Sequence, residues 1–279
     1  MEIIRSISDM KAEISRLKDQ HKSIGFVPTM GWLHEGHLSL IRAARRENQI
    51  VVISIFVNPM QFGPQEDYEE YPRDLKHDTQ AAQNEGVDYI FYPSVKEMYP
   101  EDFQTKVVVT KLKNYLCGIS RPTHFDGVTT VLTKLFNIVE PDNVYFGLKD
   151  AQQALIVNRM IQDLNFSITL HTMPIMREPD GLAMSSRNKN LSPKERESAL
   201  SLYKALMQAN KMIKNGETNP NKIKTAIRAI IANQPFTKID YIEVVNYNNL
   251  EPVNKVGPNT LIALAVWVGK VRLIDNILI

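Results

Sequence analysis

The sequence predicts an α/β fold built on a parallel sheet, because strand-like and helix-like segments alternate through its first two-thirds. Residues 50–57 form a continuous β-branched run, which is typical of a strand buried on both faces. Residues 74–85 have a helical pattern that ends at Gly86, and helices are also expected over 127–139 and 150–164. The remaining expected strands are short and apolar, at residues 24–27, 88–92, 143–146 and 167–170.

The last third predicts a smaller α+β domain. Ser192 and Glu195 frame a capping box with proline between them, which predicts a helix to about residue 215, followed by a second helix over 221–232. Residues 238–245 alternate as a half-buried strand, and two apolar runs flank a turn at residues 269–270 as in a hairpin. We therefore expect two domains, 1–175 and 176–279.

Composition and charge exclude several classes of protein. The chain has 279 residues, a formal net charge of +2, 43% hydrophobic and 23% charged residues. A net charge near zero does not indicate binding to nucleic acid or to an anionic membrane. The longest apolar runs are too short to span a bilayer. One cysteine, Cys117, fits a reducing compartment, and the first residues lack a signal-peptide pattern. We expect a cytoplasmic protein.

The segment from Pro28 to His37 predicts a nucleotide site. It follows the strand at 24–27 and leads into a helical pattern, so His34 and His37 lie near a helix N-terminus, where N–H groups and the dipole favour a phosphate. Gly36 lets a ligand approach the backbone closely. Two alternatives stay open: a structural histidine pair, or a zinc site, although the zinc-protease pattern places its histidines four apart.

Amide side chains follow the strand at 50–57. In an open parallel sheet, ligands bind beyond the carboxyl ends of the strands, where Asn58 and Gln61 could hydrogen-bond a small polar substrate. The alternative is a simple turn, since Asn-Pro favours turn initiation.

A second polar group follows the strand at 143–146. Lys149 could neutralise a phosphate, Asp150 could cap the next helix or accept from a ribose hydroxyl, and Gln153 would face the same crevice. An exposed Lys-Asp pair at a helix start is also commonplace.

A loop after the turn at 179–181 carries two hydroxyls and a guanidinium, at Ser185, Ser186 and Arg187. These groups could clamp a polyphosphate, and the alternative is a solvated linker between domains. The sequence has no P-loop, no dinucleotide fingerprint and no serine-hydrolase elbow, so any nucleotide must bind by another device.

Taken together, these segments resemble the pantoate–β-alanine ligase family, a group of nucleotidyltransferase-like enzymes with paired histidines. The resemblance rests on six motifs in order: Pro28-Thr29-Met30-Gly31-x-x-His34-x-Gly36-His37, Phe56-Val57-Asn58-Pro59-x-Gln61-Phe62, Tyr71-Pro72-Arg73, Arg121-Pro122-x-His124-Phe125-x-Gly127-Val128, Phe146-Gly147-x-Lys149-Asp150-x-Gln152-Gln153 and Arg177-Glu178-x-Asp180-Gly181-Leu182-Ala183-Met184-Ser185-Ser186-Arg187-Asn188. It implies a Rossmann-like N-terminal domain, a smaller C-terminal lid domain and a homodimer. It also implies ATP-dependent joining of (R)-pantoate and β-alanine through pantoyl adenylate, with release of pyrophosphate and AMP.

The resemblance also implies roles for particular residues. His34, His37 and Lys149 would be catalytic, with His37 as the proton donor, and Mg²⁺ would arrive with ATP, with Asp78 as a candidate contact to it. Trp32 stands where the family often has a smaller residue. The residues implied to bind ATP are Met30, Gly31, His34, Gly36, His37, Gly147, Leu148, Lys149, Asp150, Met176, Met184, Ser185, Ser186 and Arg187. Those implied to bind pantoate or β-alanine are Gln61, Gln153 and Asn58.

Two other functions are kept as alternatives. A nucleotidyltransferase that retains its nucleotidyl product would share the paired histidines but would not account for the amide pairs. An RNA-binding relative of tRNA synthetases is disfavoured by the near-neutral charge.

Overall fold

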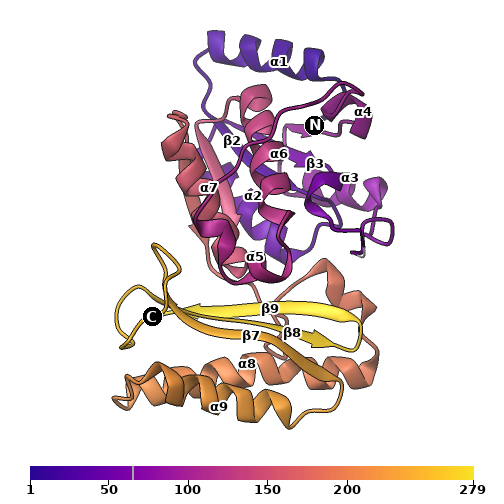
Figure 1. Ribbon diagram of the computed structural model, residues 1–279. Coiled ribbons are helices and arrows are strands. Elements are labelled where there is room, and N and C mark those ends of the chain that lie inside the picture. Colours follow the sequence, from indigo (N-terminus) through magenta and orange to yellow (C-terminus); the bar gives the residue numbers. More distant parts are fainter. Residues whose placement is uncertain (65) are drawn as a thin grey trace. The chain divides into compact units, whose positions relative to one another are not determined.

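The computed structural model describes residues 1–64 and 66–279, and the chain divides into two compact units. Each unit is assembled from three separate stretches, so the backbone passes between them several times (Figure 1). Unit 1 comprises Met1–Thr110, Arg121–Leu148 and Ile156–Pro174. Unit 2 comprises Lys111–Ser120, Lys149–Leu155 and Ile175–Ile279.

Unit 1 contains a six-stranded parallel sheet, which confirms the predicted α/β class. Its strand order is β1-β4-β3-β2-β5-β6. The two central strands are continuous apolar runs that are buried along nearly their whole length, as expected of parallel strands covered on both faces. The strands are β1 (Glu2–Ile4), β2 (Ile24–Thr29), β3 (Ile50–Ile55), β4 (Tyr89–Phe91), β5 (Asn143–Gly147) and β6 (Thr169–Met173).

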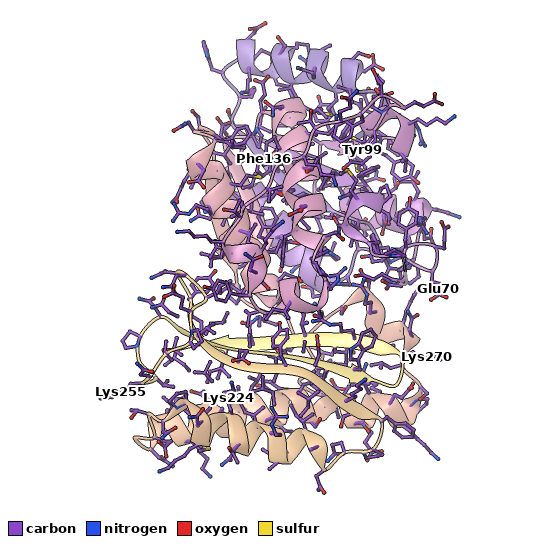
Figure 2. All side chains as sticks on the ribbon, viewed as in Figure 1. Glu70, Tyr99, Phe136, Lys224, Lys255 and Lys270 are labelled. Carbon is purple, nitrogen blue, oxygen red and sulfur yellow. The ribbon has the colours of Figure 1, made fainter. Side chains whose placement is uncertain are left out.

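Helices cover both faces of this sheet because successive side chains of a strand point to opposite sides. Val27 of β2 packs in a cluster with residues of α2 (Glu35–Glu47) and α3 (Leu75–Asn84). Its neighbour Phe26 meets Phe136 of α6 (His124–Val139) edge to face, at 6.5 Å between ring centroids. Phe136 is fully buried in unit 1 (Figure 2). The other helices with residues in unit 1 are α1 (Ile7–Asp19), α4 (Val95–Met98) and part of α7 (Ala151–Asp163).

The helix ends follow their sequence signals. Asp74 caps α3 by accepting the N–H of His77, and Gly86 stops the helix at φ +74°. In unit 2, Ser192 and Glu195 form the predicted capping box of α8 (Pro193–Lys214).

Unit 2 is built on a three-stranded antiparallel sheet in the order β7-β8-β9. The strands are β7 (Thr237–Asn246), β8 (Thr260–Val268) and β9 (Val271–Leu278), and the last two form the predicted hairpin at Gly269. Helices α8 and α9 (Pro220–Ala232) pack on this sheet (Figure 1). The apolar faces of both helices and of all three strands share one hydrophobic cluster, so this α+β unit has its own core.

Candidate active site

The strand order of unit 1 places a ligand crevice at the carboxyl ends of β2 and β5. Chain order runs β2-β3-β4 to one side of β2 and continues with β5-β6 on the other, so the direction of winding reverses between β2 and β5. Open α/β sheets bind ligands outside the carboxyl ends of the strands at such a switch point. The segment 30–37 follows β2, Asn58 and Gln61 follow β3, and Gly147 ends β5. Unit 1 thus gathers these predicted site residues at one sheet edge.

The two histidines form the cap of α2. His34 is the N-cap residue, and its Nδ1 accepts the N–H of Gly36 at 3.1 Å. His37 Nδ1 accepts the N–H of His34 at 3.3 Å, and the two ring centroids lie 4.1 Å apart. A nitrogen that accepts a backbone N–H carries no proton, so each neutral ring has its proton on Nε2. Two Nε2–H donors therefore stand at a helix N-terminus, which is itself favourable to anions.

This geometry is compatible with two of the interpretations of the histidine pair at once: a structural pair and a nucleotide site. The histidines are structural, because they satisfy N–H groups that a helix start leaves open, and they lie at a helix N-terminus, which favours a phosphate. Within residues 1–64 and 66–279, no three histidine, cysteine or acidic residues are grouped so that they could hold a metal ion. The described part of the chain thus gives the zinc interpretation no support.

Asn58 combines the turn and the amide site that its sequence context suggested. Its Oδ1 caps η1 (Pro59–Gln61) by accepting the N–H of Met60 and also accepts the hydroxyl of Tyr99 at 2.8 Å. Burial raises the pKa of the Tyr99 hydroxyl, which keeps that hydroxyl a donor. Asn58 Nδ2 donates to Gln61 Oε1 at 3.2 Å and to the carbonyl of Gly127 at 3.0 Å. Asn58 is 1% exposed, so its amide acts within the protein, where it orients Gln61.

Gln61 is held from both its main chain and its side chain. Its carbonyl lies 2.9 Å from His124 Nδ1 and 3.3 Å from a guanidinium nitrogen of Arg121. Its amide Nε2 lies 3.0 Å from the sulfur of Met30, which joins the β3 end to the loop after β2. The structure therefore brings Gln61 and Met30, both predicted site residues, into contact.

The residues after β5 have distinct roles within unit 2. Lys149 Nζ lies 3.9 Å from Asp150 Oδ2, and the main chain of Lys149 is fixed by Asn276, whose amide donates to its carbonyl at 3.0 Å. Gln152 is structural, because its amide accepts from one backbone N–H and donates to two carbonyls of the segment 111–120. By contrast, the Gln153 amide has no hydrogen-bond partner within the described residues, so it can bind a ligand.

The segment that carries the predicted phosphate clamp is an ordered part of unit 2. Arg177 and Ala183 form a β-bridge, and Met184 N donates to Met176 O at 3.0 Å, so two predicted ATP contacts are neighbours. The Arg177 guanidinium binds both oxygens of Asp275, at 2.7 and 2.9 Å. The predicted clamp lies at the start of η4 (Ser186–Asn190) and consists of Ser185, Ser186 and Arg187. An anchored hairpin of this kind is not a solvated linker.

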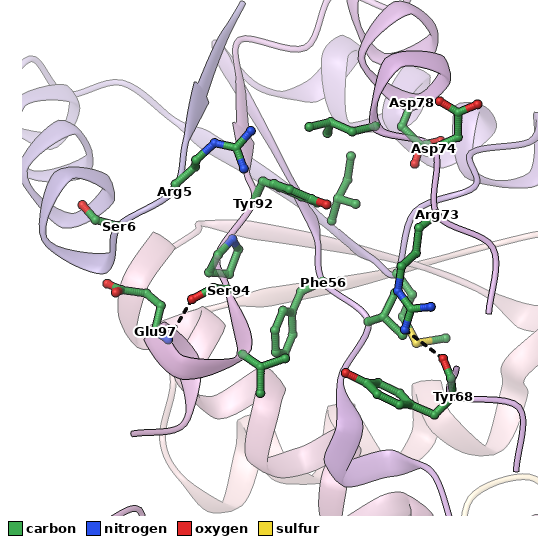
Figure 3. A pocket seen from close by; sticks show the side chains of 16 residues that line it. Arg5, Ser6, Phe56, Tyr68, Arg73, Asp74, Asp78, Tyr92, Ser94 and Glu97 are labelled. Atoms are coloured by element: carbon green, nitrogen blue, oxygen red, sulfur yellow. Dashed lines mark hydrogen bonds between the residues drawn. The ribbon is translucent and has the colours of Figure 1, made fainter. Parts of the chain in front are cut away.

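Asp78 makes contacts to the loop before α2 that the sequence did not predict. It is 1% exposed, and its two oxygens accept the N–H groups of Trp32 and Leu33, immediately before His34. A cavity of about 500 Å³ in unit 1 borders this region (Figure 3). Its lining carries charges of both signs, including Arg5, Arg73 and Asp78.

Across the described residues, every helix is too short or too polar to cross a lipid bilayer.

Comparisons with known proteins all point to one enzyme family. The family model described as pantoate–β-alanine ligase matches residues 2–278. Pantothenate synthetase of Caldicellulosiruptor saccharolyticus is 57% identical over 279 residues, covering 100% of this chain and 99% of that protein.

Solved structures show the same likeness. The crystal structure of pantothenate synthetase from Thermus thermophilus superposes with a TM-score of 0.95 at 43% identity, covering 99% of each chain. The pantoate–β-alanine ligase of Francisella tularensis, described as a complex with β-γ ATP and β-alanine, gives a TM-score of 0.83 at 37% identity, covering 100% of this chain and 97% of that one.

The fold and the histidine-capped helix define an α/β protein whose candidate site lies at a topological switch point. The chain belongs to the pantoate–β-alanine ligase family, and it is an enzyme that forms an amide bond. The resemblance drawn from the six motifs is thereby confirmed.

Proposed function

We propose that this chain joins (R)-pantoate to β-alanine at the carboxyl edge of the unit 1 sheet, using ATP and passing through pantoyl adenylate. The observation that carries this proposal is the pair of imidazoles at the N-terminus of α2, where each Nδ1 accepts a backbone N–H and each neutral ring therefore has its proton on Nε2. Nε2–H donors suit a phosphoryl group. The Gln61 amide, which lies 3.0 Å from the sulfur of Met30 in the loop before α2, is the proposed donor to the acid substrate.

The reaction divides into two balanced steps. In the first, a carboxylate oxygen of pantoate attacks the α-phosphorus of ATP, and the bond to the bridging oxygen breaks, which releases pyrophosphate. In the second, the amine of β-alanine attacks the activated carbonyl carbon, AMP leaves with the bridging oxygen, and the nitrogen loses its proton. A free carboxylate is a poor acyl donor, so adenylation provides the leaving group, and catalysis consists of positioning and charge neutralisation.

We assign the neutralisation of phosphate charge to the two histidines and Lys149. His34 and His37 donate hydrogen bonds from Nε2, and Lys149 neutralises the charge that develops in adenylation. The resemblance implies His37 as the proton donor, a role in which it would act as the imidazolium, because the N–H of a neutral ring is not acidic. Met30, Gly31 and Gly36 are proposed to line the nucleotide, and Gly36 lets it approach the main chain at the start of α2 closely. The remaining proposed ATP contacts are Gly147, Leu148, Asp150, Met176, Met184, Ser185, Ser186 and Arg187.

Gln61 and Gln153 are the proposed partners of pantoate, through its hydroxyls and carboxylate, and Gln61 also meets β-alanine. Asn58 serves the same site through Gln61, since its amide nitrogen donates to Gln61 Oε1. Fixing that oxygen as an acceptor turns the Gln61 Nε2 toward the substrate side near Met30.

Mg²⁺ fits this site as an ion that arrives with ATP. The described residues lack a ready-made cluster of three protein ligands, and magnesium commonly keeps several waters and binds substrate phosphates instead. When bound, the ion would neutralise phosphate charge, alongside Lys149 and Arg187.

We further propose a cytoplasmic homodimer whose C-terminal domain, residues 176–279, acts as a lid. Support for the boundary comes from the core of unit 2, which includes α8, α9 and the whole antiparallel sheet within that range. Support for the dimer and the lid is the family resemblance, and sedimentation equilibrium tests the dimer.

Oxygen-18 in the pantoate carboxylate tests the adenylate directly. Attack by that carboxylate transfers one labelled oxygen to AMP, which mass spectrometry detects in the product. Unlabelled AMP, formed together with pantothenate, would contradict the proposed intermediate.

A further inference from the structure

We infer that Asp78 is a positioning residue of this enzyme: its carboxylate holds the main chain before α2 in the conformation that presents His34 and His37. The inference rests on the phosphate roles proposed above for these two histidines. Asp78 belongs to α3 and follows Leu33 by 45 residues in the chain, so the contact is a tertiary one.

The loop before α2 forms an anion-binding nest that the protein itself fills. Gly31 and Trp32 both have positive φ, +85° and +51°, so that the N–H groups of Trp32 and Leu33 converge. Trp32 N donates to Asp78 Oδ2 at 2.8 Å, and Leu33 N donates to Oδ1 at 2.7 Å. Such concavities commonly hold a phosphate, but here a carboxylate occupies the nest, so the phosphates must be met by the histidines and α2.

The conformation of Trp32 needs this support. A left-handed backbone is unfavourable for a side chain as large as tryptophan, and it persists only where the surroundings enforce it. Two successive residues of α3 supply that enforcement. Asp78 binds the main chain, and the His77 ring stacks on the indole at 5.6 Å with an interplanar angle of 26°. His77 Nδ1 also lies 3.1 Å from Asp78 Oδ1, which ties the two contacts together.

Little freedom is left between this nest and the histidines. Leu33 is followed directly by His34, whose N–H binds His37 Nδ1 and whose ring caps α2. A Cβ on Gly31 would lie 2.8 Å from Asp78 Oδ2, so the loop and the carboxylate are also in close steric contact. Loss of the carboxylate would therefore release the turn that sets the position of both imidazoles.

The buried charge of Asp78 is accounted for by the same contacts. Its oxygens accept two backbone N–H groups, and charge-assisted hydrogen bonds of this kind stabilise a carboxylate strongly. A role as magnesium ligand makes a different prediction, because raised Mg²⁺ would then restore a weakened variant.

The test compares Asp78→Asn with Asp74→Asn. Each variant replaces one carboxylate with an amide near the N-terminus of α3. Asp74 caps α3, and asparagine caps a helix as well as aspartate does, so Asp74→Asn retains activity. Asparagine at 78 must turn its NH₂ toward one of the two N–H groups. We expect kcat for adenylation to fall about 100-fold, the scale for misplacing catalytic groups by about 1 Å, with much smaller changes in KM for ATP.

Two further measurements separate positioning from folding and from metal binding. In a Trp267→Phe background, the fluorescence of Trp32 reports the loop, and it shifts in Asp78→Asn but not in Asp74→Asn. Replacing Trp32 by glycine in Asp78→Asn removes the steric cost of positive φ and recovers at least about tenfold of the lost kcat. If Asp78→Asn does not fold, the double variant is compared with Trp32→Gly alone. Unchanged kcat in Asp78→Asn, recovery by Mg²⁺, or a folded double variant without recovery would each overturn the inference.

Discussion

A single methyl group at Gly127 should impair the proposed pantoate site, because helix α6 and the turn η1 touch at that position. A Cβ built on Gly127 would lie 2.3 Å from Met60 O, 2.4 Å from Met60 C and 2.5 Å from Gln61 N. Ordinary nonbonded contacts begin near about 3.5 Å, so the main chain of η1 must retreat by roughly 1 Å. These are backbone atoms that a rotamer change cannot move aside.

The displacement acts directly on Gln61 and also on Asn58, whose Nδ2 donates to the Gly127 carbonyl. We expect Gly127→Ala to lower kcat/KM for pantoate by about 100-fold, the cost of a misplacement of about 1 Å. An opposing effect exists, since alanine in a helix is favoured over glycine by about 1 kcal/mol. Activity therefore falls only if the steric clash with η1 costs more free energy than alanine gains in the helix.

The assay is AMP formation with pantoate varied, accompanied by titration calorimetry with ATP. ATP affinity should be retained, because the histidine loop is not touched. Gly257→Ala is the matched control, since no atom lies within 4 Å of its added Cβ. A Gly127→Ala enzyme with normal pantoate kinetics and raised thermal stability would refute this reasoning.

Four other substitutions test separate parts of the site. Lys149→Ala should slow adenylation by about three orders of magnitude, the scale for losing a major transition-state contact, and near-normal pyrophosphate release would remove Lys149 from that role. Gln153→Ala should weaken pantoate binding while ATP binding stays intact, and calorimetry showing the reverse would take Gln153 out of the pantoate site. Gln152→Ala should instead lower the free energy of unfolding by about 1–3 kcal/mol, since it leaves buried backbone groups unpaired, and an unchanged melting temperature would contradict this. Tyr99→Phe removes the donor to Asn58 Oδ1 and should cost about 1 kcal/mol in pantoate kcat/KM, roughly a fivefold loss, so unaltered kinetics would show that Asn58 is oriented without it.

Local patterns in the sequence predicted most of the fold. Strand β3 is a continuous β-branched run, and the box at Ser192 and the stop at Gly86 are chemical signals that act within one helical turn. Strand β1 and helix α1 were not predicted. Three residues at a sheet edge are too few to show a period, and the pairing of β1 with β4 joins segments far apart in sequence.

The sequence pointed to candidate site residues where a motif lies next to a strand end, and it missed contacts between segments that are far apart in the chain. The sequence suggested His34 and His37 but could not reveal that both Nδ1 atoms serve the backbone. It placed Gln153 at the crevice and gave no role to its neighbour Gln152, and only the fold shows that Gln152 binds the segment 111–120. The nest filled by Asp78 depends on two positive φ angles and a partner on another helix, which no local pattern encodes.

AMP formation from ATP and Mg²⁺, measured while pantoate and β-alanine are left out in turn, tests the ligation reaction itself. We expect sustained AMP release only with both substrates present, matched mole for mole by pantothenate. A folded protein that binds ATP but forms no AMP with both substrates would contradict the assignment of the acid substrate to the Gln61 edge of this sheet.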